Sequence, residues 1–191
     1  MEQGILSQFD VGDNNLFLSS KGLTELLANY DKRDPAKNVI WATDPHIELP
    51  ILMGKSGLGS LPPMTCMDFW KGILKQFGSL PALSDKVNGK WQAISFQEYY
   101  DLIIKFALGL IRLGISERSA VSILGYNCSL WHINFFGAVF ANCVACGHYL
   151  TNAPDAVQYV LEHSDTELFV VENQDQLNKV LQIWDKCPRL K

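Results

Sequence analysis

Apolar residues first recur at helical spacing in a stretch that begins at Thr65 and ends at Gly78. Threonine is a favoured residue type at the start of a helix, and glycine is a favoured residue type at its end. The spacing therefore predicts a helix with one buried face. The residues expected on that face are Met67, Trp70, Ile73, Leu74 and Phe77.

A hairpin and a second helix are predicted next. Asn88-Gly89 lies between two short extended runs and is a strong local signal for a two-residue hairpin turn. Ser95 is followed three residues later by Glu98, the pattern of a capping box, and Gly114 is expected to end this helix in the left-handed conformation. The side chains expected to be buried are Tyr99, Leu102, Ile103, Phe106, Leu110 and Leu113.

Short apolar runs then alternate with amphipathic stretches up to Lys191. The runs at 120–125, 144–149 and 167–172 are predicted to be buried strands. Helices are predicted over 130–141, over 154–163 and from Asn173 to Pro188. The buried face of the first is expected to consist of Trp131, Phe135, Ala138 and Val139. That of the second is expected to consist of Val157, Val160 and Leu161, and that of the third of Leu177, Val180, Leu181 and Trp184. Such alternation indicates an α/β fold with a parallel sheet, here preceded by a helix and a hairpin.

Residues 1–64 show no comparable pattern. Five of the eight prolines lie between Pro35 and Pro63, and a short helix around 23–30 is the one regular element expected there. We therefore predict an irregular leader or linker over 1–64 and an incomplete α/β domain over 65–191.

Composition narrows the possible functions. The chain has a formal net charge of −4 and a pI of about 5.5, which argues against nucleic acid as a partner. Five cysteines, an odd number, favour a reducing compartment. The first residues do not have the basic and apolar segments of a signal peptide or the arginine-rich character of a transit peptide. The sequence therefore predicts a cytoplasmic protein.

No Asp, Glu, Lys or Arg occurs between Ser119 and Pro154. The stretch 130–150 within it has the length of a membrane span, but polar residues and two glycines interrupt it and no basic cluster flanks it. We predict a buried helix followed by a buried strand, and no transmembrane helix.

Few residues are candidates for chemistry. Cys143 and Cys146 form a C-x-x-C pair, but no second pair completes a zinc site, and the pair does not begin a helix as a redox pair would. We interpret both as buried hydrophobic residues. Gly54-Lys55-Ser56 resembles the end of a phosphate-binding loop, but Leu49 stands where the first glycine of that motif belongs.

The remaining candidates do not form a motif either. The Gly57-x-Gly59 pair continues to Pro62 and not to glycine, and there is no G-x-S-x-G sequence. The four histidines, His46, His132, His148 and His163, have no ligand or triad spacing. His132 and His148 are expected to line a core or a pocket. The sequence thus predicts no catalytic, cofactor-binding or metal-binding residue.

Several spaced segments carry a resemblance to a known family. They are Ile40 to Thr43, Pro62 to Thr65, Gly89 to Tyr100, Phe106 to Ile115, Ser122 to Asn127 with Trp131, Gly147 to Val160, and Val170 to Lys191. In this order they resemble the N-terminal region of the AMP-forming acyl-CoA synthetases, most closely the bubblegum type of long-chain fatty acid–CoA ligases, over about four-fifths of the chain.

The resemblance implies that residues 65–191 are part of an AMP-binding (adenylate-forming) domain. The family reaction converts a long-chain fatty acid, ATP and CoA into acyl-CoA, AMP and diphosphate with the help of Mg²⁺. The family's phosphate loop, adenine motif, ribose-binding Asp and catalytic Lys are expected beyond Lys191, so no catalytic residue or cofactor is assigned to this chain. His148, Leu150 and Ala153 depart from the family's usual residues and leave an acyl-pocket role of that segment open.

Three functional hypotheses follow. The first is an N-terminal piece of a fatty acid–CoA ligase that is inactive alone, with peripheral contact to the endoplasmic reticulum or other membranes. The second is a non-catalytic short form that binds acyl chains or pairs with a full-length synthetase. The third is a flavodoxin-like nucleotide binder with its ligand at the carboxyl ends of the strands, near 126–129, where the usual phosphate-binding glycines are missing.

Overall fold

The computed structural model describes residue 51 and residues 53–191, and the chain divides into two units, 1–63 and 64–191. In the first unit the described residues contain a short 3-10 helix, η3 (Leu58–Ser60). The N–H of Gly54 donates to the carbonyl of Gly59 at 2.7 Å, which closes the glycine-rich segment into a turn. The helix expected over 23–30 lies outside the described residues.

The predicted first helix is confirmed as α2 (Cys66–Phe77). The Thr65 hydroxyl accepts the N–H of Asp68 at 3.1 Å, as expected of a helix cap. Trp70 is buried, but the expectation for Met67 was wrong, because its side chain is 41% exposed. Met67 lies in the first turn, and the residue that enters the core lies one turn further on.

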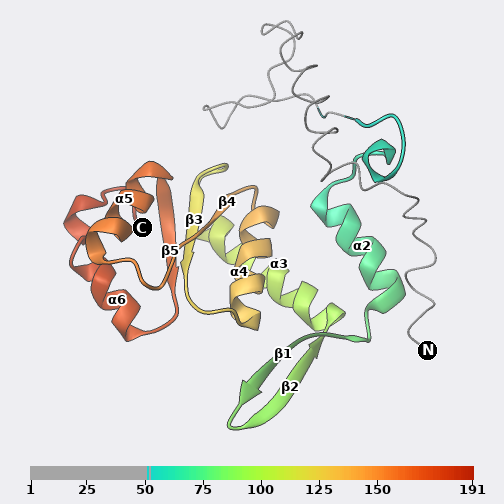
Figure 1. The fold of residues 1–191 in the computed structure, drawn as a ribbon, viewed down its shortest axis with the longest axis horizontal. Coiled ribbons are helices and arrows are strands. Elements are labelled where there is room, and N and C mark those ends of the chain that lie inside the picture. Colours follow the sequence, from blue (N-terminus) through green and yellow to red (C-terminus); the bar gives the residue numbers. More distant parts are fainter. Residues whose placement is uncertain (1–50, 52) are drawn as a thin grey trace, which may run out of the picture. The chain divides into compact units, whose positions relative to one another are not determined.

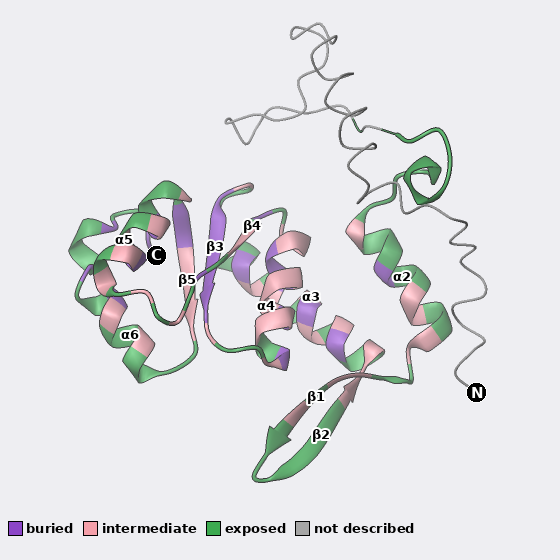
Figure 2. Ribbon diagram, viewed as in Figure 1, coloured by how far each residue is buried: buried purple, intermediate pink, exposed green. Residues whose placement is uncertain are grey.

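The predicted hairpin is also confirmed, with β1 (Pro81–Val87) antiparallel to β2 (Lys90–Ser95). Asn88 and Gly89 both have positive φ, 50° and 79°, as a type I′ turn requires. The base of the hairpin packs against the helices through Leu83 and Ile94. Its turn end projects away from them and is exposed (Figures 1 and 2).

The second helix is α3 (Phe96–Arg112), and its capping box forms as predicted. The N–H of Glu98 donates to the Ser95 hydroxyl, and the N–H of Ser95 donates to the Glu98 carboxylate at 2.8 Å. Gly114 has a φ of 67°, as expected for a left-handed helix end. Leu113 was wrongly expected to be buried. It is 64% exposed because the helix ends at Arg112 and the chain turns there.

A three-stranded parallel sheet forms the centre of the second unit, in the order β4-β3-β5. Its strands are β3 (Ala120–Leu124), β4 (Val144–Gly147) and β5 (Thr166–Val171), linked by α4 (Ser129–Phe140) and α5 (Pro154–His163), and α6 (Gln174–Leu181) follows β5. The α/β fold class with a parallel sheet is therefore confirmed (Figure 1). β4 is two residues shorter than expected.

Helices cover both faces of this sheet. Along β5, Leu168 and Val170 pack with α3 and α4, whereas Phe169 and Val171 pack with the core formed by α5 and α6. β3 lies between its two neighbours and is buried at every position (Figure 2). This explains why its sequence is almost continuously apolar and does not alternate.

The buried face of α4 was predicted only in part, because Ala138 is buried as expected but the other expected residues are not. Its buried residues include Ile133, Gly137 and Ala138, whereas Trp131 and Phe135 are half-buried. α4 is apolar around most of its circumference, so periodicity alone does not identify the side that faces the core.

The end of the last helix was also predicted incorrectly. Leu177, Leu181 and Trp184 are exposed, and the buried residues are Val180, Ile183, Cys187 and Leu190. α6 ends at Leu181, well before Pro188, and the chain continues into the 3-10 helix η4 (Trp184–Lys186). The change of helical period rotates the later residues away from the face that an uninterrupted α-helix would bury.

Gly137 lets α4 approach α3 closely, and this gives a testable contrast. A Cβ at position 137 would lie 2.5 Å from Cδ1 and 3.0 Å from Cβ of Phe106. Gly137→Ala is therefore expected to lower the free energy of unfolding by about 1–3 kcal/mol. Gly109→Ala in α3 meets nothing within 4 Å, and we expect it to raise stability by about 0.5–1 kcal/mol. Urea unfolding measures both changes, and a stabilised Gly137→Ala variant would contradict the close contact.

Candidate functional site

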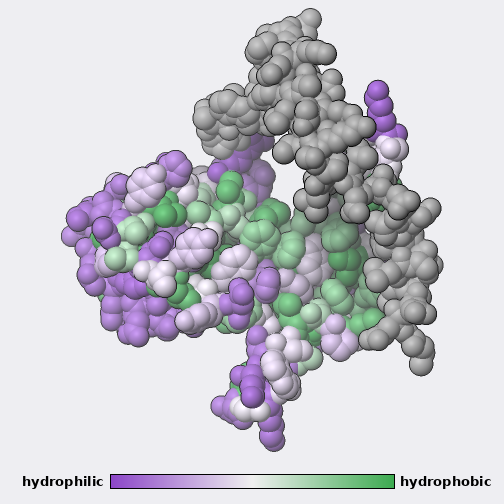
Figure 3. All heavy atoms as spheres, viewed as in Figure 1, coloured by the Kyte–Doolittle hydropathy of each residue, from purple (hydrophilic) through white to green (hydrophobic). Residues whose placement is uncertain are grey.

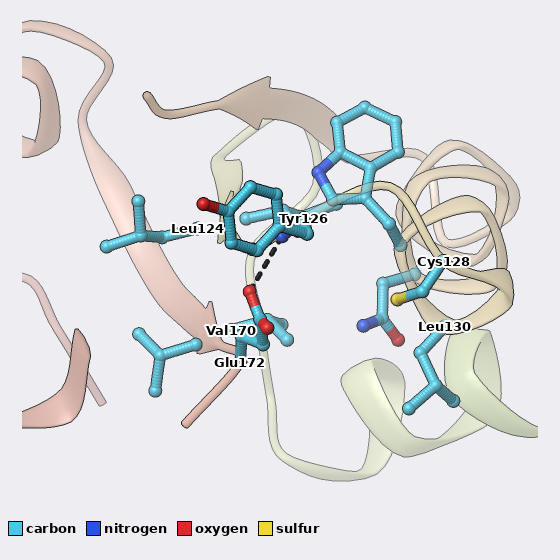
Figure 4. A pocket seen from close by; sticks show the side chains of 11 residues that line it. Leu124, Tyr126, Cys128, Leu130, Val170 and Glu172 are labelled. Atoms are coloured by element: carbon cyan, nitrogen blue, oxygen red, sulfur yellow. Dashed lines mark hydrogen bonds between the residues drawn. The ribbon is translucent and has the colours of Figure 1, made fainter. Parts of the chain in front are cut away.

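The connections of the sheet place a crevice at the carboxyl ends of β3 and β5. After β3 the chain enters α4 on one face, and after β5 it enters α6 on the opposite face. Adjacent strands whose connections leave in opposite directions open a crevice where ligands of open α/β sheets bind. A pocket of about 110 Å³ lies there (Figure 4). It is lined by Ile123, Leu124, Gly125, Tyr126, Cys128, Leu130, Trp131, Asn134, Val170, Val171 and Glu172.

Glu172 joins the two strand ends beside this pocket. Its carboxylate accepts the N–H of Tyr126 at 2.7 Å, and its own N–H donates to the carbonyl of Leu124 at 3.0 Å. Figure 4 shows the carboxylate directed at the start of the loop that carries Tyr126. The other walls are mainly apolar, with Cys128 and Leu130 on the α4 side. This pocket suits a small apolar group more than a phosphate.

A second, open groove adjoins the pocket at the carboxyl ends of β3 and β4. It has a volume of about 500 Å³ and is lined by Gly125, Tyr126, Asn127, Trp131, Gly147, His148, Tyr149 and Leu150. Tyr126 and Tyr149 are 71% and 80% exposed. We name the pocket and this groove together the carboxyl-end groove.

His148 is the buried polar residue of the carboxyl-end groove. Its side chain is 9% exposed, its ring lies 4.7 Å from that of Phe169, and neither ring nitrogen has a hydrogen-bond partner among the residues described. Burial lowers the pKa of His148 to about 4, so the imidazole is neutral at pH 7. The sequence expectation that His148 lines a core or a pocket is confirmed.

This buried imidazole makes stability depend on pH. Between about pH 6.5 and 4 the unfolded chain binds a proton at His148 that the folded chain does not bind, so stability falls as the pH falls. We expect His148→Leu to remove this loss, so that its stability advantage over the original chain grows by about 2 kcal/mol between pH 7 and pH 5. Urea unfolding at the two pH values measures this difference. Equal pH dependence of the two proteins would contradict a buried neutral histidine.

The other candidate residues are not brought together. Cys143 is buried with a pKa raised by burial, Cys146 is half-buried in β4, and both thiols are free. His132 contacts Trp131, and His163 stacks on Tyr159 at the end of α5. His46 lies outside the described residues.

Mg²⁺, which the resemblance implies for the whole enzyme, requires a group of oxygen ligands. Within 53–191 no three side chains of His, Cys, Asp or Glu gather in a group that fits a metal ion. Lys55 lies in an exposed turn that is followed by a 3-10 helix and not by an α-helix with a phosphate-binding N-terminus. These residues do not fit Mg²⁺, and no reaction step is derived through it.

Sequence reasoning missed an ionic cluster around Glu167, whose carboxylate is buried while Arg189 and Lys191 are half-exposed. The side chain of Glu167 is 5% exposed and accepts hydrogen bonds from the Ser116 N–H, Arg189 Nη2 and Lys191 Nζ, each at 2.9 Å. Burial by itself raises the pKa of Glu167, but these donors outweigh it and hold the pKa at about 2. The cluster joins the start of β5 to the segment that contains Arg189 and Lys191, and it therefore stabilises the fold.

Comparison with known proteins identifies the family of this chain. The family model described as "AMP-binding enzyme" matches residues 72–191. The chain belongs to the AMP-binding enzyme family. It is 34% identical over 165 residues to the long-chain-fatty-acid–CoA ligase ACSBG2 of Homo sapiens, with 86% of this chain and 25% of that protein covered. It is 37% identical over 129 residues to the ligase ACSBG1 of Rattus norvegicus, with 68% and 18% covered. The chain thus spans about a fifth to a quarter of the length of these relatives.

Solved structures of two CoA ligases share the fold. The anthranilate CoA ligase AuaEII, in complex with anthranoyl-AMP, matches with a TM-score of 0.59 and 21% identity over 68% of this chain and 24% of that one. A benzoate CoA ligase from Burkholderia xenovorans LB400 matches with a TM-score of 0.60 and 16% identity over 68% and 25%. At these identities the likeness concerns the fold alone.

A helix that crosses a membrane must be long and apolar. Among the residues that the structure describes, no helix is both long and apolar enough to cross a bilayer.

Proposed function

We propose that this chain forms the N-terminal part of the AMP-binding domain of a bubblegum-type long-chain fatty acid–CoA ligase. The domain part would comprise residues 65–191, with 1–64 as a leader or linker. The observation that carries the proposal is the 34% identity to human ACSBG2 over 86% of the chain, together with the family match over 72–191. The reaction of the whole enzyme would join a long-chain fatty acid to CoA with conversion of ATP to AMP and diphosphate.

The part played by residues 65–191 would be structural. Attack of a carboxylate on the α-phosphate of ATP requires cations and N–H donors placed around the developing charge. The carboxyl-end groove instead offers apolar walls, a neutral imidazole and the carboxylate of Glu172. ATP, Mg²⁺ and CoA would therefore be bound with the help of residues outside this chain, and the chain alone would be inactive.

An exchange assay tests this proposal. The 191-residue chain is expected to show no ATP–diphosphate exchange dependent on a long-chain fatty acid, while human ACSBG2 serves as the positive control. Robust exchange by the chain would contradict the structural role. Reading the coding frame downstream of Lys191 gives an independent test, because a Ser/Thr/Gly-rich phosphate loop ending in Lys-Gly is expected there. A stop codon with no such exon would contradict the assignment to a longer ligase.

A second candidate function is a short form that pairs with a full-length synthetase. It is favoured by the strand order β4-β3-β5, because β4 and β5 form the outer edges of the sheet within the described residues, and unpaired strand edges accept further strands. Co-purification of the chain with a full-length synthetase would support pairing. Aggregated chain that captures no synthetase would count against it.

The place of action proposed for the protein is the cytoplasm, with peripheral contact to the endoplasmic reticulum or another membrane. The proposed substrate supports this, because a long-chain fatty acid partitions into bilayers through its many apolar CH₂ groups. Cell fractionation with and without high salt would test the proposal, and a peripheral protein is expected to leave the membrane fraction in salt.

A further inference from the structure

The turn end of the β1–β2 hairpin presents an apolar side chain that the fold does not use. We name residues 86–91 the hairpin tip. Trp91 is 73% exposed and Val87 is 41% exposed. Tryptophan is among the largest apolar side chains and is highly buried on average, so this exposure calls for a physical reason. Figure 1 shows the tip extending away from α3 and α4.

The hairpin tip also carries positive charge beside the indole. Lys86 lies directly across the strand pair from Trp91, and Lys90 is its neighbour along β2. Both lysines are exposed, and within the described part of the chain no carboxylate lies within 4 Å of either ammonium group. The nearby Asp85 carboxylate is engaged elsewhere, because it accepts the N–H of Ser129 at 3.1 Å and 3.3 Å.

Asp85 at the same time holds the hairpin in place. Cys128 supplies no side-chain cap to α4, and the Asp85 carboxylate takes that role from another element. The packed base of the hairpin and its type I′ turn also help to fix the hairpin in position. The hairpin tip is thus positioned without further ordering, which lowers the entropy cost of binding a surface.

We propose that the hairpin tip is a contact site for an anionic phospholipid surface. Tryptophan favours the headgroup region of a bilayer, and lysines beside it are attracted by acidic headgroups. The same lysines argue against a protein partner, since lysine is depleted in protein–protein interfaces. Figure 3 shows a predominantly polar hairpin, which fits the headgroup layer and not the hydrocarbon core, whereas hydrophobic residues gather over α3 and α4. This inference rests on the peripheral membrane contact proposed above and names the surface that makes it, whereas it does not depend on the ligase reaction.

Vesicle sedimentation tests the inference with the full 191-residue chain. Vesicles of phosphatidylcholine with 30 mol% phosphatidylserine are compared with pure phosphatidylcholine, at about 0.05 M and 0.5 M salt. We expect binding to the anionic vesicles at low salt and its loss at high salt. Lys86→Gln/Lys90→Gln is expected to weaken this binding about 25-fold, or about 5-fold for each lysine. Trp91→Ala should weaken it several-fold, and Trp91→Tyr should restore most of it, because tyrosine shares the preference for the interface.

Matched variants separate the hairpin tip from general charge and aromatic effects. Lys105→Gln/Lys186→Gln removes the same charge from exposed positions on α3 and η4, and Trp184→Ala removes another exposed indole. We expect both to bind as the original chain does. The inference would be overturned if the original chain did not bind anionic vesicles, if it bound neutral vesicles equally well, or if the control variants lost as much binding as the tip variants. Circular dichroism of each variant verifies that it is folded.

Discussion

Glu167→Gln is expected to lower the free energy of unfolding at pH 7 by about 3 kcal/mol. Glutamine imitates the protonated carboxyl group, and a pKa held at about 2 against an ordinary 4.5 corresponds to about this energy. The change removes the negative charge that Arg189 and Lys191 contact at 2.9 Å. Urea unfolding measures the loss. Asp68→Asn is the matched control, because the Asp68–Lys71 pair is exposed to solvent and its loss is expected to change stability far less.

The lowered pKa of Glu167 also predicts how the stability of the chain declines at acidic pH. Its pKa is lower in the folded chain than in the unfolded chain, so its contribution is fully present above about pH 5 and is lost as the pH falls toward 2. The Gln variant lacks this contribution and should show a flatter decline in that range. If stability fell with pH in the same way in both proteins, the contacts with Ser116, Arg189 and Lys191 would not be what lowers the pKa of Glu167.

Trp70→Ala is expected to cost about 3–5 kcal/mol, the usual range for a large buried aromatic residue. Trp70 is 3% exposed, and its ring lies 4.9 Å from that of Tyr99 and 5.4 Å from that of Phe136, so it joins α2, α3 and α4. The same aromatic cluster buries Tyr99 enough to raise its pKa to about 12. Loss of the indole would leave a cavity shared by three helices.

Trp70→Phe separates packing from hydrogen bonding. The indole Nε1 is buried without a hydrogen-bond partner among the residues described, so phenylalanine removes an unsatisfied donor together with part of the ring. We expect Trp70→Phe to cost less than half as much as Trp70→Ala in urea unfolding. Equal losses would indicate a bound water or partner at Nε1. Trp184→Ala, at a 46% exposed position, should change stability by less than about 1 kcal/mol.

Local signals in the sequence predicted most of the elements correctly. The Ser95–Glu98 capping box, the Asn88-Gly89 turn and the alternation of strands and helices depend on a few neighbouring residues, and all three are confirmed. The faces of α4 and of the last helix were correct only at Ala138 and Val180, for different reasons. α4 is apolar on most sides, and the last helix changes to a 3-10 period that residue spacing did not reveal.

The carboxyl-end groove was less predictable than the elements. Its walls come from segments that follow β3, β4 and β5, and only the strand order brings these segments together. His148 was expected to line a core or a pocket because it lies in an uncharged stretch. Glu167 was not recognised, because its partners are Ser116 on one side of the sequence and Arg189 and Lys191 on the other, and they show no periodicity.

The position of β3 has a consequence during synthesis on the ribosome. β3 is the middle strand, and both of its neighbours follow it in the sequence. The end of β5 is translated about fifty residues after β3, or roughly three to ten seconds later. During that interval β3, which is apolar except for Ser122, has at least one unpaired edge, so the nascent chain is expected to be most prone to aggregation before its sheet can close.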